Sequence, residues 1–112
     1  MNDVFLKIIN RELPAEIIYE DDICIAFFDK FPLQKGHFLV VPKTLSKNIT
    51  EADDQTAAHL INVARKLAKE RILDKGIPGF KTLINTGKAA DQVIFHTHVH
   101  IIPYYEENQK DN

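Results

Sequence analysis

Three of the five histidines in the chain stand at alternate positions of one short segment, and this spacing constrains the fold more than any other feature of the sequence. His96, His98 and His100 alternate with residues that are mostly apolar. Successive side chains of a β-strand point to opposite faces of a sheet, so a strand here places the three imidazoles on one face. Three adjacent imidazoles do not suit a hydrophobic core. The pattern therefore predicts a strand with one packed face and one face that carries out chemistry.

A face of three imidazoles fits more than one kind of chemistry. Neighbouring imidazoles depress one another's protonation unless an anion such as phosphate lies among them, and a neutral imidazole nitrogen can attack phosphorus. Imidazole is also a ligand for zinc, copper and iron, and His37 and His59 could complete a metal site. A solvated polar face is a third interpretation, for which Lys, Thr or Glu would be commoner choices. The spacing alone favours phosphate chemistry and leaves the metal site open.

The composition fits a single domain over residues 1–112, of which 45% are apolar, enough to bury a core. The 14 basic and 16 acidic residues give a net charge of −2, so there is no electrostatic case for a nucleic-acid partner. The single cysteine, Cys24, is read as a small buried hydrophobe and excludes an internal disulfide. No apolar window approaches the roughly 18 residues of a membrane span, and no basic leader begins the chain. We therefore expect a cytoplasmic protein with no membrane partner.

The rest of the chain divides into one long helical pattern and several segments typical of strands. Apolar residues at three- and four-residue steps predict a helix over residues 50–75, capped by Thr50 and followed by Gly76. The links between the predicted strands are short except for this helix, which favours an α+β fold with a five-stranded antiparallel sheet covered by the helix on one face. The polar tail, 106–112, is expected to be flexible. The other expected elements are a short N-terminal helix over 4–10 and strands over 17–19, 23–28, 37–41, 81–85 and 93–102.

The histidine segment resembles the signature of a known family. The run His96-Thr97-His98-Val99-His100-Ile101-Ile102 is similar to the His-x-His-x-His-x-x motif of the histidine triad (HIT) superfamily. The chain most resembles the Hint-like branch and bacterial HIT hydrolases of similar length. That resemblance implies a HIT-like fold and a homodimer whose two sheets join into one. Further blocks of the chain match the family in the same order, namely 5–14, 18–22, 26–29, 36–43 and 85–87.

The resemblance implies catalytic roles for four histidines. His98 matches the nucleophile that forms a nucleotidyl-histidine. The backbone carbonyl of His96 would accept the Nδ1 proton of His98 and leave Nε2 free to attack. His100 and His37 would lie beside the α-phosphate. His59 matches no family role, and we interpret it as a residue on the helix surface.

The resemblance also implies a nucleotide-binding set. Asp29 matches the carboxylate that takes the ribose hydroxyls, and two acceptor oxygens suit a vicinal diol. Asn85 and Gln92 would hydrogen-bond phosphate oxygens or the leaving group. The apolar walls around a purine base would be formed by Val4, Phe5, Ile8, Phe27 and Phe28.

The chain departs from its relatives at several of these positions. Val93 stands where many relatives carry Ser or Thr beside the leaving group, and Asp91 replaces a glycine. The resemblance therefore says less about the leaving group than about the rest of the site. Many bacterial relatives hold a structural zinc with two cysteines and a histidine. Asp3, Leu6 and Leu45 stand at those places here, so we predict no such zinc, and the chemistry implied by the resemblance needs no metal or cofactor.

The predicted function is that of a nucleotide hydrolase or transferase. It would act at the α-phosphate of purine nucleotide conjugates of the AMP type, and adenosine 5′-phosphoramidate is the substrate that we favour. A diadenosine polyphosphate hydrolase is the first alternative. The others are a nucleotide-binding sensor with vestigial activity and a metalloenzyme built on the same histidines.

Overall fold

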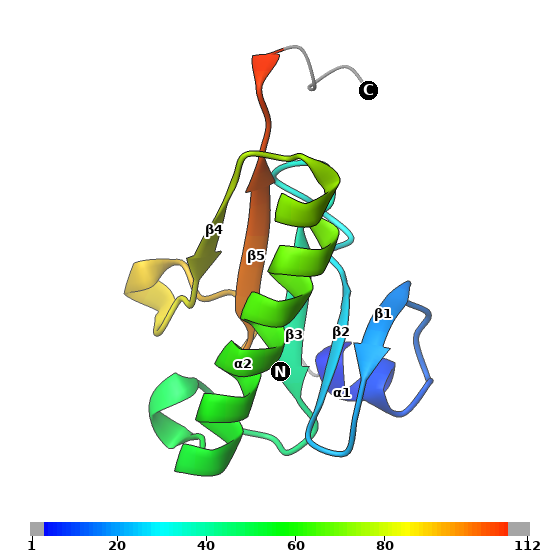
Figure 1. Cartoon of the computed structure of the whole chain (residues 1–112). Helices are drawn as coiled ribbons and strands as arrows, with labels where there is room; N and C mark the ends of the chain where they lie inside the picture. Colours follow the sequence, from blue (N-terminus) through cyan, green and yellow to red (C-terminus); the bar gives the residue numbers. More distant parts are fainter. Residues whose placement is uncertain (1–3, 108–112) are drawn as a thin grey trace.

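Five antiparallel strands form one sheet in the order β1-β2-β3-β5-β4 (Figure 1). The computed structural model describes residues 4–107, so the end of the predicted tail and Asp3 lie outside the described residues. The predicted α+β architecture, with one long helix and a short N-terminal helix, is confirmed. The strands are β1 (Ile17–Glu20), β2 (Cys24–Phe28), β3 (Phe38–Pro42), β4 (Gly79–Leu83) and β5 (Val99–Tyr104).

The helical part of the chain is more divided than the sequence predicted. Helix α1 covers Val4–Ile9, and the long helix α2 covers Asp54–Arg71. Three single turns of 3-10 helix flank the longer elements: η1 (Ile49–Glu51), η2 (Leu73–Lys75) and η3 (Lys88–Ala90).

The predicted cap of the long helix at Thr50 is wrong. Thr50 lies in η1, where its N–H donates to Oδ1 of Asn48 at 2.9 Å. Ala52 is then extended, with φ −72° and ψ 144°, so the helix cannot run through it. Asp53 caps α2 instead, because its carboxylate accepts the N–H of Thr56 at 2.8 Å. Gly76 ends η2 in the left-handed conformation, with φ 83°.

The two faces of the sheet pack against different helices. Helix α2 crosses the front of the sheet in Figure 1, and α1 lies behind it. Alternate residues of each strand therefore enter separate cores. The core under α2 includes Cys24, Ala26, Phe38, Val40, Leu60, Ala64, Leu67, Val99 and Ile101. The core under α1 is formed by Phe5, Ile8, Ile25, Phe27, Leu39 and Val41.

The last strand begins later and ends later than predicted. The expected strand over 93–102 is wrong in its first half, since β5 starts at Val99. Residues before it turn away from the sheet because Thr97 is held by another segment, its N–H donating to the carbonyl of Ser46 at 2.8 Å. Pro103 does not end β5. Pairing of β5 with β3 stops at Ile101, so at Pro103 the strand pairs only with β4. The missing N–H of proline therefore breaks no hydrogen bond to β3.

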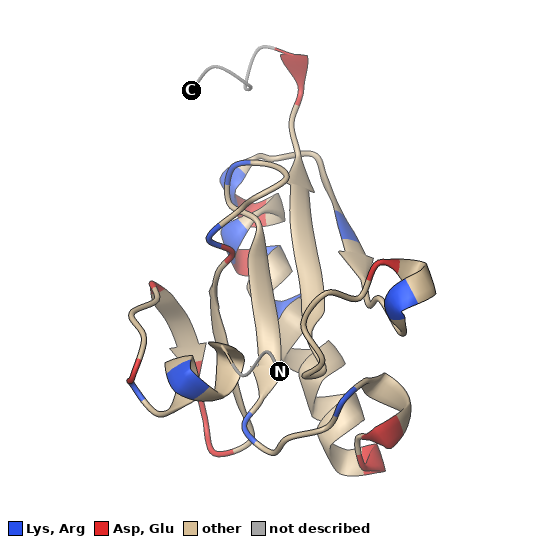
Figure 2. Ribbon diagram, turned by 180° about the vertical axis from the view of Figure 1, so that it is seen from behind, with Lys and Arg blue, Asp and Glu red and all other residues tan. Residues whose placement is uncertain are grey.

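Most charged residues lie in the loops and outer elements, and the central strands of the sheet contain none (Figure 2). Neither β3 nor β5 contains Lys, Arg, Asp or Glu. Among residues 4–107, no helix combines the length and apolar character that crossing a membrane requires.

Candidate active site

Three separate elements bring four of the predicted site residues together. His100 lies in β5, His98 directly before it, His37 directly before β3, and Phe5 in α1. The ring centroids of His98 and His100 lie 4.8 Å apart, and those of His37 and His100 lie 5.2 Å apart. The ring of Phe5 meets His98 edge to face at 5.0 Å. Strand β5 pairs with β3 on one side and β4 on the other, so the site is built on the middle of the sheet.

The imidazole of His98 is oriented by one backbone carbonyl. Its Nδ1 lies 2.7 Å from the carbonyl oxygen of His96, the contact that the resemblance implied. A carbonyl can only accept, so Nδ1 carries the proton and Nε2 of the neutral ring holds a lone pair. Burial lowers the pKa of His98, although the His96 carbonyl opposes that shift. The neutral ring, with a free Nε2, is therefore the dominant form near neutral pH.

The side chain of His96 lies on the same side of the sheet as that of His98, since both rings meet Phe5 edge to face. His96 is 1% exposed, and its Nε2 donates to the carbonyl of Pro42 at 2.8 Å. Its Nδ1 is buried and has no hydrogen-bond partner among residues 4–107. The three imidazoles thus lie on the α1 side of the sheet, as strand alternation predicted, although both His96 and His98 precede β5. The ring ties this segment to the end of β3 and thereby fixes the carbonyl that holds His98.

His37 and His100 form a hydrogen-bonded pair. Nε2 of His37 lies 3.0 Å from Nδ1 of His100, and Nδ1 of His37 accepts the N–H of Leu33 at 3.0 Å. Burial lowers the pKa of His37, while the charge of Asp29 raises it. Burial, followed by repulsion from His98 and His37, lowers the pKa of His100 to about 4. Both rings are thus neutral near pH ~7.

Asp29 combines a turn role with a place at the site. Its Oδ1 accepts the N–H of Phe31 at 2.9 Å, which is the turn contact that an Asp after a strand often makes. Its Oδ2 lies 3.5 Å from Nε2 of His37. One carboxylate oxygen therefore remains at the edge of the histidine cluster.

Gln92 requires a correction. The side chain is 3% exposed, and its amide nitrogen donates to the carbonyls of Lys47 and Ile94 at 2.7 and 3.0 Å. Its Oε1 accepts the N–H of Gly87 at 2.8 Å. Both polar atoms of Gln92 are thus engaged in holding loops together, which leaves no free donor for a phosphate. Asn85 is half-buried after β4, and Val93 is 75% exposed.

The apolar wall beside the histidines is smaller than predicted. Phe5, Ile8 and Phe27 pack together on the α1 face, with Val4 against them. Phe28 belongs to the opposite face, under α2, where it packs against the other core. Consecutive strand residues point to opposite faces, so Phe27 and Phe28 cannot line one wall. The assignment of Phe28 to the base-binding wall is therefore wrong.

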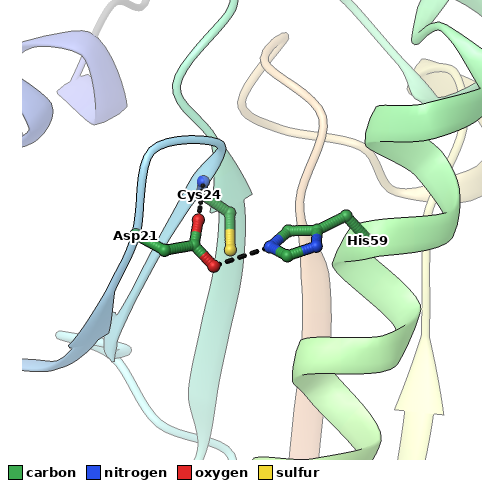
Figure 3. Close-up of side chains that lie close together, drawn as sticks. All are labelled: Asp21, Cys24 and His59. Carbon is green, nitrogen blue, oxygen red and sulfur yellow. Dashed lines mark hydrogen bonds and ion pairs between the residues drawn. The ribbon is translucent and has the colours of Figure 1, made fainter.

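His59 is not the plain helix-surface residue that we expected. Its Nε2 lies 2.6 Å from Oδ2 of Asp21 (Figure 3). The same oxygen also accepts from the hydroxyl of Tyr19 at 2.7 Å. Oδ1 of Asp21 accepts the N–H groups of Ile23 and Cys24, both at 2.8 Å. This carboxylate fastens the turn between β1 and β2 to α2. No local pattern in the sequence indicates the pair, because its two members are 38 positions apart.

Two groups of described side chains offer donor atoms at a spacing that could suit a metal ion, Asp21–Cys24–His59 and Asp29–His37–His100. In the first group, burial raises the pKa of the Cys24 thiol to about 12, and the carboxylate already accepts several hydrogen bonds. In the second group, the N–H of Leu33 at Nδ1 of His37 leaves the ring proton on Nε2, the atom that would bind the metal. Both donor sets fit hydrogen-bonded networks better than a resident cation.

Known proteins resemble this chain over most of its length. A family model described as HIT domain matches residues 10–107. A 13.1 kDa HIT-like protein of Mesomycoplasma hyorhinis is 55% identical over 94% of this chain and 95% of its own. An adenylylsulfatase of Arabidopsis thaliana, HINT3, is 39% identical over 94% of this chain, which spans 53% of that protein. A HIT family hydrolase from Clostridium thermocellum superposes with a TM-score of 0.83 at 36% identity, covering 95% of this chain and 93% of that one.

Proposed function

Because the chain belongs to the histidine triad (HIT) family, we propose that it hydrolyses purine nucleotide conjugates at the α-phosphate, or transfers the nucleotidyl group, through a nucleotidyl-histidine at His98. The observation that carries this proposal is the contact of 2.7 Å between Nδ1 of His98 and the carbonyl of His96. It leaves the Nε2 lone pair of a buried, neutral imidazole free for attack.

The proposed reaction has two steps. Nε2 of His98 forms a bond to the α-phosphorus, and the bond from phosphorus to the leaving group breaks with its electron pair on that group. An amine takes a proton from solvent as it leaves. The phosphorylated ring is cationic and retains its Nδ1 proton, which the His96 carbonyl stabilises. Water then attacks the same phosphorus, the phosphorus–nitrogen bond breaks, and the water's proton passes to solvent or to a neighbouring base. The products are the nucleoside monophosphate and free His98.

The neighbouring residues supply binding and charge stabilisation in this proposal. An N–H of His100 would donate to the phosphate oxygens, where negative charge grows in the transition state. Oδ2 of Asp29, at the edge of the histidine cluster, would accept from the ribose hydroxyls. Phe5, Ile8 and Phe27 would form the apolar surface under the base.

The leaving group is the finer part of the proposal. We favour adenosine 5′-phosphoramidate, with diadenosine polyphosphates as the alternative hydrolase substrates. Val93 has no hydroxyl to protonate an amine, so the amine that leaves the phosphoramidate would take its proton from solvent, whereas phosphate and sulfate depart as stable anions. The relative from Arabidopsis is named an adenylylsulfatase, so adenylyl sulfate belongs in the same panel. A nucleotide-binding sensor with vestigial activity is the rival from another class.

The assembly is also a proposal. Strand β4 lies at one edge of the sheet, so its backbone groups on that side are available to a second copy. We propose a cytoplasmic homodimer in which two β4 strands pair and join the two sheets. Size measurement in solution tests this, and a monomer at all concentrations would contradict it.

A substrate panel tests the function. Wild type and His98→Ala are compared on adenosine 5′-phosphoramidate, diadenosine polyphosphates and adenylyl sulfate, with and without chelator, while AMP binding is measured for both. Turnover by wild type in chelator, and its loss in His98→Ala, supports the proposal. If both proteins bind AMP and neither turns over any conjugate, the sensor is correct. If chelator abolishes turnover, the metalloenzyme is correct.

A further inference from the structure

One backbone amide in the loop between β2 and β3 faces the ring of His37. The N–H of Leu33 donates to Nδ1 of His37 at 3.0 Å. A backbone amide nitrogen can only donate, so Nδ1 must hold a lone pair. His37 is 2% exposed and neutral, so its single ring proton has to be on Nε2.

The proton on His37 determines the proton on His100. Nε2 of His37 lies 3.0 Å from Nδ1 of His100, and because Nε2 donates, Nδ1 of His100 accepts. The proton of neutral His100 is therefore on its own Nε2. Oδ2 of Asp29, 3.5 Å from Nε2 of His37, is a second acceptor that favours the same arrangement. The reverse order of protons would require an acceptor at Leu33, where the backbone offers only a donor.

We propose that the backbone amide of Leu33 is a positioning group that sets the tautomers of His37 and His100, so that a neutral His100 presents an N–H donor to the α-phosphate. This inference deepens the proposed function and rests on it for the identity of the phosphate. In the opposite tautomer, Nε2 of His100 would present a lone pair to the phosphate oxygens and repel them.

The arrangement gives opposite tautomers to two rings that lie side by side. His98 carries its proton on Nδ1 and keeps Nε2 as a nucleophile, because the His96 carbonyl accepts from it. His100, with its ring centroid 4.8 Å from that of His98, carries its proton on Nε2 and acts as a donor. Two backbone groups thus give chemically identical side chains different roles. The carbonyl of His96 makes His98 the nucleophile, and the amide of Leu33 makes His100 the donor that stabilises charge.

Nitrogen NMR of isotope-labelled imidazoles in the wild-type chain reads these tautomers directly. The expected result is a protonated Nε2 and a bare Nδ1 in both His37 and His100, and the reverse in His98. A proton on Nδ1 of His37 would overturn the inference. The measurement does not depend on turnover, so it decides the tautomers even if no conjugate is hydrolysed and the proposed function fails.

A matched pair of variants links the tautomers to rate. Leu33→Pro removes the N–H, and Leu33→Ala keeps the N–H while it shortens a side chain that is 69% exposed. We expect Leu33→Pro to mix the tautomers of His37 and to lower kcat about tenfold or more, with a smaller change in KM. Leu33→Ala should resemble wild type. If proline at this place prevents folding, an ester bond in place of the Leu33 amide removes the same hydrogen. Equal tautomers and equal kcat in the N–H-less protein and Leu33→Ala would refute the proposal.

Discussion

The side-chain hydroxyls of Ser46 and Thr97 lie 2.6 Å apart in the interior, and the N–H of Thr97 donates to the carbonyl of Ser46 at 2.8 Å. Both residues are buried. Thr97 stands between His96 and His98, so this double contact holds the segment that carries the nucleophile onto the loop after β3. It explains why the segment leaves the sheet before β5 begins.

Removal of the Thr97 hydroxyl should weaken the fold and the site together. Thr97→Val keeps the shape of the side chain but leaves the hydroxyl of Ser46 without its partner. A buried unsatisfied hydroxyl costs about 1–3 kcal/mol, which urea unfolding would measure. The control is Thr44→Val, at an exposed threonine, and it should unfold like wild type. Equal stabilities of the two variants would contradict the role assigned to this contact.

The Asp21 carboxylate should stabilise the protein in a pH-dependent manner. Burial raises the pKa of Asp21, but hydrogen bonds from Tyr19 and His59 outweigh it and hold the pKa well below its usual range. A carboxylate with a depressed folded pKa stabilises above its unfolded pKa of about 4 and loses that contribution as pH falls further. Asp21→Asn should therefore lower the free energy of unfolding by about 1–3 kcal/mol near neutral pH.

Urea unfolding at several pH values tests this prediction, with a substitution of the adjacent aspartate as the control. The gap between wild type and Asp21→Asn should narrow as pH falls below about 4, where the wild-type carboxylate becomes protonated. Asp22→Asn is the matched control, because Asp22 is exposed and adjacent. A stability difference between wild type and Asp21→Asn that does not change with pH would show that the Asp21 network is not electrostatic. An equal loss of stability in Asp22→Asn would show the same.

The pH profile of turnover should extend unusually far into acid. Burial lowers the pKa of His98, and burial with repulsion from its neighbours lowers the pKa of His100 to about 4. The reactive neutral rings therefore persist below the ordinary histidine pKa of about 6.5. We expect the acid limb of kcat/KM, which reports the free enzyme, to fall below that value. An acid limb at or above it would contradict the assignment of the neutral ring as the attacking species.

Two neighbouring phenylalanines should differ in their effect on nucleotide binding. Phe27 lies on the α1 face with Phe5, and Phe28 lies under α2 with the guanidinium of Arg71 over its ring at 5.3 Å. Phe27→Leu should weaken AMP binding several-fold in calorimetry, while Phe28→Leu should leave it within about twofold and act on stability alone. Equal losses of AMP affinity would place the binding surface elsewhere.

The periodicity of apolar residues predicted the long helix and the sheet well, because it reflects which side chains are buried. The helical stripe and the alternating strands predicted the core under α2, and the short links indicated that the sheet is antiparallel. The approach of His37, His98 and His100 followed from the resemblance and is present in the structure. The roles of these histidines in catalysis remain predictions.

The features that sequence reasoning missed depend on contacts between distant segments. The ring of His96 is held by the carbonyl of Pro42, 54 positions away. The contact of Gln92 with Lys47 and the pairing of His59 with Asp21 also join residues far apart in the chain, by 45 and 38 positions. The donor at Leu33 is a backbone N–H, which every residue except proline carries, so the residue type at this position could not predict the hydrogen bond to His37. Phe28 is different, since strand alternation could have separated it from Phe27.

The most direct test of the account is a search for the covalent intermediate. Wild-type protein is mixed with an adenosine phosphate conjugate, quenched during turnover and digested, and the peptides are examined by mass spectrometry. The account predicts one AMP adduct, located on His98 and absent from His98→Ala. Turnover with the AMP adduct on another residue, or full activity in His98→Ala, would contradict it.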